Sequence, residues 1–118
     1  MPNPLRRQRS RPASKPGRTK TPTPRVESRK VSVLIGAFKA ERWLRESVNS
    51  VLSQALPPGW SLEIIIGVDG CEKTLDVAKK LTDPRIGVVW FDINRGTYVT
   101  FNSLVPLSTG EVFVRHDA

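Results

Sequence analysis

From residue 31 to the end of the sequence, four short apolar runs alternate with segments that have helical periodicity. The apolar runs are rich in β-branched residues and lie at residues 31–35, 62–68, 86–91 and 112–114. Their apolar character is continuous rather than alternating, which is typical of strands that are buried on both faces. Because strands separated by helices join in parallel through right-handed crossovers, the pattern predicts an α/β fold with a layered, mostly parallel sheet.

Three helices are predicted between these strands. The first runs over about 40–54, because its apolar residues recur at intervals of three and four along one face, and Pro57-Pro58-Gly59 ends it. A second helix falls within 72–81, and a third follows Asn94 and Gly96, which suit a helix cap and a tight turn. The apolar face of the first helix comprises Trp43, Leu44, Val48, Val51, Leu52 and Ala55.

The net charge of +8 over 118 residues suggests an anionic partner, so the location of the charge matters. Residues 1–30 contain ten of the 19 Lys and Arg residues and a single acid, Glu27, and they carry the whole positive excess. They also contain six of the ten prolines and almost no large apolar side chains. Such a segment cannot bury enough surface to offset the entropy of ordering. We therefore predict a disordered basic tail over residues 1–30 and a folded domain over residues 31–118.

Two interpretations of the tail stay open: a solvated leader, or a contact with polyanions or an anionic membrane surface. Nucleic acid is not an expected partner of the domain itself, because residues 31–118 are not basic and do not interleave aromatic with basic residues. The single cysteine, Cys71, excludes an intrachain disulfide and fits a reducing compartment. We expect a cytoplasmic protein, or one that is peripheral at the inner face of a membrane.

Short polar segments follow three of the predicted strands, at residues 36–39, 68–71 and 116–118. In an open parallel α/β sheet, ligands bind at the carboxyl ends of the strands. A glycine such as Gly36 lets a ligand approach the backbone closely. The carboxylate of Asp69 can accept hydrogen bonds from a base or a ribose, although Asp69 and Gly70 can equally form a simple turn.

The order and spacing of these segments resemble the start of a family 2 glycosyltransferase, over nearly all of residues 31–118. The resemblance implies the GT-A fold, a three-layer, Rossmann-like nucleotide-binding half with a mostly parallel sheet. It also implies transfer of a sugar from a nucleotide-sugar donor to an unidentified acceptor, with inversion at the sugar carbon. The segments that carry the resemblance are Val31–Ile35, Ala40–Gln54, Leu62–Gly70, Asn94-Arg95-Gly96 with Asn102, and Thr109–Ala118.

The resemblance assigns donor binding to residues at the strand ends. Asp69 matches the acid that contacts the base, but Val68 replaces the first of two adjacent acids, so the base stays open between uridine, the commonest, and others. Phe38 stands where the family usually has a tyrosine, and it either packs near the base or belongs to the core. Asp117 matches the first acid of the Asp-x-Asp motif, which contacts the ribose. The nucleotide-sugar-binding residues are thus predicted to be Gly36, Ala37, Phe38, Asp69 and Asp117.

A divalent cation, Mn²⁺ or Mg²⁺, is the cofactor that the resemblance implies. Asp117 is a candidate ligand, and the main ligand is expected immediately after Ala118. The general base of the family also lies downstream, so no catalytic residue is predicted, and we interpret His116 as structural. We therefore expect the chain to be the donor-binding, amino-terminal portion of the family domain and to be inactive in transfer on its own. The alternative is a non-catalytic remnant that at most binds a nucleotide.

Overall fold

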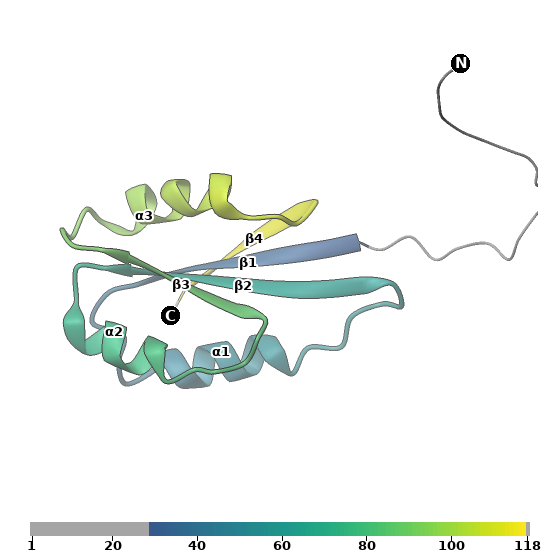
Figure 1. The fold of residues 1–118 in the computed structure, drawn as a ribbon, viewed down its shortest axis with the longest axis horizontal. Coiled ribbons are helices and arrows are strands. Elements are labelled where there is room, and N and C mark those ends of the chain that lie inside the picture. The colour runs from purple at the N-terminus through teal and green to yellow at the C-terminus, as the bar shows by residue number, and fades with distance from the viewer. Residues whose placement is uncertain (1–28, 118) are drawn as a thin grey trace, which may run out of the picture.

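The structure is a computed structural model that describes residues 29–117 (Figure 1). Residues 1–28, for which the sequence predicts a disordered tail, and Ala118 lie outside the described residues. Arg29 and Lys30, which the sequence analysis places in the tail, are the first two residues of strand β1 (Arg29–Ala37). They pair with Trp60 and Ser61 of the neighbouring strand, so the first strand begins two residues earlier than predicted.

Strands and helices alternate along the chain in the predicted order, which confirms the α/β fold. The third strand has the predicted bounds, and the other three are longer than predicted. The first helix is shorter than 40–54, because residues 41–43 form a turn in which the Trp43 and Leu44 N–H groups both donate to the Ala40 carbonyl. The elements after β1 are α1 (Leu44–Leu52), β2 (Trp60–Asp69), α2 (Glu72–Lys79), β3 (Ile86–Phe91), α3 (Thr97–Leu104), a 3₁₀ turn (Val105–Leu107) and β4 (Val112–Asp117).

The four strands form one parallel sheet in the order β3-β2-β1-β4. Helices α1 and α2 cover one face and α3 covers the other, so the predicted three layers are confirmed (Figure 1). Because consecutive residues of a strand point to opposite faces, Ile35 packs on the side of α1 and Leu34 on the side of α3. Because the strands are parallel, their carboxyl ends lie at the same edge, and the sheet order places β1 between β2 and β4.

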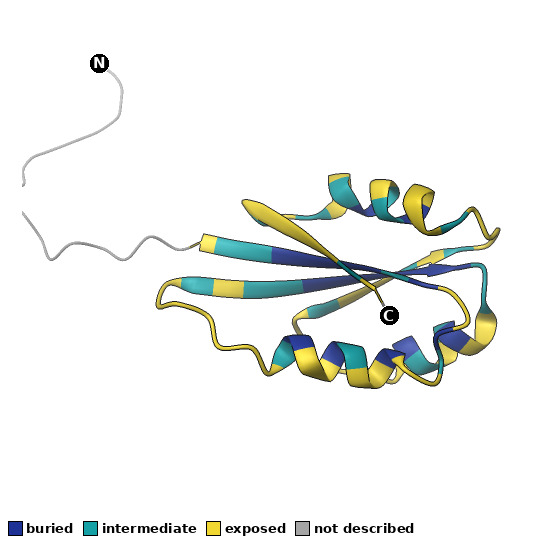
Figure 2. Cartoon of the chain, turned by 180° about the vertical axis from the view of Figure 1, so that it is seen from behind, coloured by how far each residue is buried: buried dark blue, intermediate teal, exposed yellow. Residues whose placement is uncertain are grey.

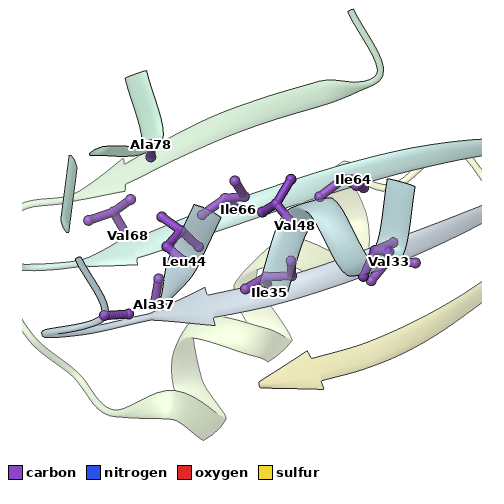
Figure 3. Close-up of a cluster of buried hydrophobic side chains, with 11 residues drawn as sticks. Val33, Ile35, Ala37, Leu44, Val48, Ile64, Ile66, Val68 and Ala78 are labelled. Atoms are coloured by element: carbon purple, nitrogen blue, oxygen red, sulfur yellow. The ribbon is translucent and has the colours of Figure 1, made fainter. Parts of the chain in front are cut away.

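Most of the core lies between the two central strands and the helices α1 and α2 (Figure 3). Ile35 and Ile66 are fully buried there, in one cluster with Leu44 and Val48 of α1. A smaller cluster lies under α3, where Leu34 and Ile65 of the sheet meet Leu104 of the helix. Burying a side chain of this size stabilises a fold by about 1.5–3 kcal/mol, so β1 and β2 are the elements that hold the domain together.

The two outer strands are much more exposed than the sequence predicts. Burial on both faces is confirmed for β1 and β2, but it is wrong for β3 and β4 within residues 29–117 (Figure 2). The reason is positional, because each outer strand has a single neighbour and the helices cover the centre of the sheet. On β4, Val112, Phe113 and Val114 each leave 45–47 % of their surface exposed. Among the described residues, no helix is both long and apolar enough to cross a membrane.

A polar network on the α3 side of the sheet fixes the start of β4. The Glu63 carboxylate accepts hydrogen bonds from the Ser32 hydroxyl at 2.6 Å and from the Thr109 backbone N–H and hydroxyl, each at 2.9 Å. The Ser32 hydroxyl oxygen accepts a further bond from the Gly110 N–H at 2.9 Å. One carboxylate on β2 therefore joins β1 to the segment that leads into β4.

This network makes the stability of the domain depend on pH. Burial by itself would raise the pKa of Glu63, but the hydrogen bonds from Ser32 and Thr109 outweigh burial and hold that pKa below its ordinary value of 4.5. A lowered pKa in the folded state stabilises the fold above about pH 4.5 and ceases to do so as the pH falls through the lowered value. We expect the difference in unfolding free energy between wild type and Glu63→Gln, from urea titrations at pH 3 to 7, to shrink below pH 4.5. A difference that is constant over this range would contradict the assigned role.

Candidate functional site

An open cleft of about 330 Å³ lies at the carboxyl edge of the sheet, on the side of α3. Three of its lining residues are predicted donor-binding residues, namely Gly36 at the end of β1, Phe38 in the following loop and Asp117 at the end of β4. The other two are Thr97, the first residue of α3, and Arg115 of β4. The structure thus brings together residues that are far apart in the sequence, as expected for a parallel α/β sheet.

Gly36 forms the floor of this cleft. It lies opposite Asp117 in the pairing of β1 with β4. A Cβ atom at Gly36 would lie 3.6 Å from Thr100 Cγ2 and 3.7 Å from Thr97 Cγ2, which is ordinary van der Waals contact. The fold therefore does not require glycine at this position for packing. What glycine leaves free is a methyl-sized space beside the backbone, next to Thr97 and Thr100, which an atom of a bound ligand can occupy.

The loop after β1 presents an aromatic ring to the cleft. Phe38 leaves 44 % of its surface exposed, so the interpretation of Phe38 as an ordinary core residue is wrong. The next residue, Lys39, has a φ angle of 52°, and its Nζ lies 5.3 Å from the centre of the Phe38 ring. Left-handed backbone is uncommon for residues other than glycine and is often found at functional sites. Ala37 is buried in the core on the side of α1, so only its backbone is near the cleft.

Asp69 is also buried, with 2 % of its surface exposed, and it is absent from the lining of the cleft. Its carboxylate accepts hydrogen bonds from the loop that precedes α3: from Asn94 Nδ2 at 3.0 Å, from the Arg95 N–H at 2.9 Å and from the Gly96 N–H at 2.9 Å. Asn94 therefore does not cap α3 as predicted, since the helix has Gly96 in the capping position and no side-chain cap. The structure shows a positioning role for Asp69, whose predicted contact with a nucleotide stays a prediction.

Gly70 allows this loop to come so close to the end of β2. Its φ angle is +69°, a conformation that side chains rarely adopt, and a Cβ atom there would lie 2.6 Å from the backbone nitrogen of Asn94. Asp69 and Gly70 together hold the loop of residues 94–96 against β2, and this loop delivers Thr97 to the cleft. The alternative interpretation of Asp69 and Gly70 as a simple turn does not account for their contact with residues 94–96.

The charged side chains of the cleft come from β4. Asp117 leaves 78 % of its side chain exposed, and its Oδ1 lies 3.5 Å from Arg115 Nε. The Arg115 guanidinium carbon lies 5.7 Å from the centre of the Phe101 ring on α3. His116 falls between them in the strand and therefore points to the face of the sheet opposite the cleft, and its structural role stays a prediction.

Sequence reasoning missed Thr97 and Arg115. Arg115 is two residues before Asp117 in a strand, so its side chain must lie on the same face. That spacing was a sufficient signal to find it. Thr97 carries no comparable signal, because its place at the cleft depends on how the loop of residues 94–96 is held.

The arrangement fits a divalent cation only in part. Within residues 29–117, no group of three or more His, Cys, Asp or Glu side chains is arranged to hold a metal ion. In the part of the chain that the structure describes, Asp117 is the one carboxylate that lines the cleft. Mn²⁺ and Mg²⁺ are often held by one or two carboxylates together with phosphate oxygens of a substrate. The cleft therefore suits a cation that arrives with a diphosphate better than a cation bound by the protein alone.

A parallel sheet with helices on both faces and a cleft at the carboxyl edge is the architecture of open, layered α/β domains, which bind their ligands at that edge. The model of glycosyl transferase family 2 matches residues 32–118, so the chain belongs to this family. It is 32 % identical over 91 residues to a putative glycosyltransferase, EpsE, of Bacillus subtilis (strain 168), over 75 % of this chain and 32 % of that protein. It is also 32 % identical over 91 residues to an uncharacterized glycosyltransferase of Haemophilus influenzae, over 75 % of this chain and 27 % of that protein.

Among solved structures, the fold is similar to that of the mannosyltransferase PcManGT from Pyrobaculum calidifontis in complex with GDP-Man and Mn²⁺. The TM-score is 0.66 and the identity is 21 %, over 74 % of this chain and 26 % of that one. This likeness confirms the GT-A-type fold. The chain spans about a third or less of the length of each of these three proteins.

Proposed function

We propose that this chain supplies the donor-binding part of a transferase that moves a sugar from a nucleotide-sugar to an acceptor. The observation that carries the proposal is the cleft at the carboxyl edge, where Gly36, Phe38 and Asp117 meet in a chain of family 2. The diphosphate of the donor would lie over Gly36 and beside Asp117. The ring of Phe38 would pack against the nucleoside.

The base of the donor is proposed to be uracil or guanine. The family resemblance favours a UDP-sugar, whereas the mannosyltransferase of similar fold is in complex with GDP-Man. Phe38 offers an aromatic face that stacks on either base without distinguishing them. Both nucleotides therefore belong in every binding experiment.

Asp117 is proposed as the residue that would hold a divalent cation arriving with the diphosphate. When bound, the cation would offset the negative charge that develops on the departing nucleoside diphosphate. Asp117 is exposed enough to turn toward such a cation without disturbing the core. The reaction is proposed to invert the sugar carbon, so an acceptor hydroxyl must lose its proton to a general base. Asp117 is assigned to the donor, and among residues 29–117 no other carboxylate lines the cleft, so we expect the 118-residue chain to bind the donor without transferring its sugar.

The Gly36→Ala variant tests the position of the donor without disturbing the fold. Gly36 lies in a strand and has no positive φ, and the new methyl group would make only ordinary contacts. We therefore expect the free energy of unfolding to stay the same or to rise by about 0.4–1 kcal/mol. The methyl group would occupy the floor of the cleft and overlap with the proposed position of the diphosphate. An overlap that costs about 1–3 kcal/mol would lower the affinity for UDP or GDP by about tenfold or more.

The measurement is a calorimetric titration with each nucleotide in the presence of Mn²⁺, together with a thermal melt. Gly87→Ala is the matched control, because a Cβ atom at Gly87 on β3 would have only the Ile64 carbonyl oxygen within reach, at 4.0 Å. Equal affinities of Gly36→Ala, Gly87→Ala and wild type would remove the donor from the floor of this cleft.

A further inference from the structure

Arg115 is a positively charged side chain of the protein that lines the cleft. It lines the cleft together with Asp117, and both side chains project from the same face of β4. Two contacts restrain the guanidinium group. Its Nε lies 3.5 Å from Asp117 Oδ1, and its central carbon lies 5.7 Å from the centre of the Phe101 ring.

The same guanidinium keeps its capacity to donate hydrogen bonds. An arginine carries five N–H groups in a planar fork. At 3.5 Å the contact with Asp117 is an ion pair rather than a short hydrogen bond, and 45 % of the Arg115 side chain stays exposed. The group is therefore oriented by its neighbours and still open to a ligand in the cleft.

The charges in the cleft indicate which ligand the Arg115 guanidinium can bind. Asp117 alone would repel a diphosphate, because like charges at this range oppose each other. Arg115 offsets that charge, and its fork matches the paired oxygen atoms of phosphate groups. We propose that Arg115 binds the diphosphate of the nucleotide donor directly, so that part of the affinity for the donor does not depend on a metal ion. This inference rests on the proposed function, because it assumes that the donor occupies the cleft.

The test is a calorimetric titration of the full 118-residue chain with UDP and with GDP, in EDTA and again with Mn²⁺. In EDTA, we expect wild type to bind a nucleoside diphosphate weakly and Arg115→Gln to bind it about tenfold or more weakly still. Arg115→Lys keeps the charge without the fork, so we expect an intermediate affinity. The corresponding nucleoside, uridine or guanosine, has no phosphate, and its affinity should not change between wild type and Arg115→Gln.

Arg29→Gln is the matched control. Arg29 also pairs with an acid, Glu111, at 3.0 Å, lies 4.8 Å from the centre of the Trp60 ring and is exposed to the same extent, 46 %. It lies at the other end of β1, away from the cleft. A loss of affinity in Arg115→Gln that Arg29→Gln does not share supports direct binding by Arg115.

Three other outcomes separate this inference from the proposed function. If wild type binds UDP or GDP and Arg115→Gln binds it equally well in EDTA and in Mn²⁺, the inference on Arg115 is overturned while the donor site stands. If wild type binds neither nucleotide under either condition, the proposed function itself fails and the inference fails with it. Binding by wild type only in Mn²⁺ would also overturn the metal-independent role of Arg115.

Discussion

Replacing Asp69 by alanine is expected to destabilise the domain more than any other single truncation of a polar side chain among the described residues. The carboxylate is buried and accepts hydrogen bonds from Asn94 Nδ2 and from the N–H groups of Arg95 and Gly96. A buried donor that loses its partner costs about 1–3 kcal/mol. With three donors affected, we expect a loss of about 3 kcal/mol or more in the free energy of unfolding and a fall in Tm of roughly 12 °C or more.

Thermal and urea unfolding of Asp69→Ala, Asp69→Asn and Asp76→Ala measure this effect. Asp69→Asn keeps the shape but replaces an accepting oxygen by a donating amide, so we expect it to be destabilised as well. Asp76 is exposed on α2, which makes Asp76→Ala the control that should retain the stability of wild type. If Asp69→Ala were as stable as wild type, Asp69 would not hold the loop of residues 94–96. Its predicted contact with the nucleotide would then be the favoured role.

Gly110→Ala is expected to have the second large effect, at the start of β4. A Cβ atom at this position would lie 2.8 Å from the Ser32 nitrogen, 2.9 Å from the Lys30 carbonyl oxygen and 2.6 Å from the Ser32 hydroxyl. Two of these atoms belong to the backbone of β1 and cannot move aside without shifting the strand. Overpacking of this kind costs about 1–3 kcal/mol and occasionally more. We therefore expect Gly110→Ala to lower the free energy of unfolding by about 3 kcal/mol.

The control for Gly110→Ala is again Gly87→Ala, where the same methyl group would have only the Ile64 carbonyl oxygen within 4.0 Å. Urea titrations of the two variants give the comparison. The shift caused by Gly110→Ala should also displace Arg115 and Asp117, because both lie on β4, which begins two residues after Gly110. A Gly110→Ala variant as stable as Gly87→Ala would show that the start of β4 is not fixed by its contact with β1.

Periodicity alone was sufficient to predict the parallel α/β fold and the order of its elements. The bounds of β3 were predicted correctly, since Ile86–Phe91 is a continuous apolar run between polar neighbours. The same continuity led to a wrong prediction of burial for β3 and β4, because an apolar run does not show whether a strand lies at the centre or at the edge of a sheet. Val33 and Ile66 are buried on central strands, whereas Val114 on β4 is half exposed.

The candidate site was predictable where it depends on strand ends and unpredictable where it depends on loops. Gly36 and Asp117 meet because the carboxyl ends of parallel neighbours share one edge. Asp69 also sits at that edge, but its partner is a loop 25–27 residues further along the chain. Only the folded arrangement shows that this loop covers Asp69 and leaves the cleft to Thr97 and Arg115.

The most direct test of the donor site is the effect of Asp117→Asn on nucleotide affinity with and without a cation. The side chain is 78 % exposed, so the substitution should leave the stability of the domain unchanged. If a cation joins Asp117 to the diphosphate, titration with UDP or GDP in Mn²⁺ should show about tenfold weaker binding in Asp117→Asn, the loss of one charge-assisted contact. In EDTA the same variant should bind as well as wild type or better, because a negative charge beside the phosphates is gone. Equal affinities of the two proteins in Mn²⁺ would contradict the role of Asp117 in holding the cation, and no binding of either nucleotide by wild type would contradict the assignment of this cleft to a nucleotide-sugar donor.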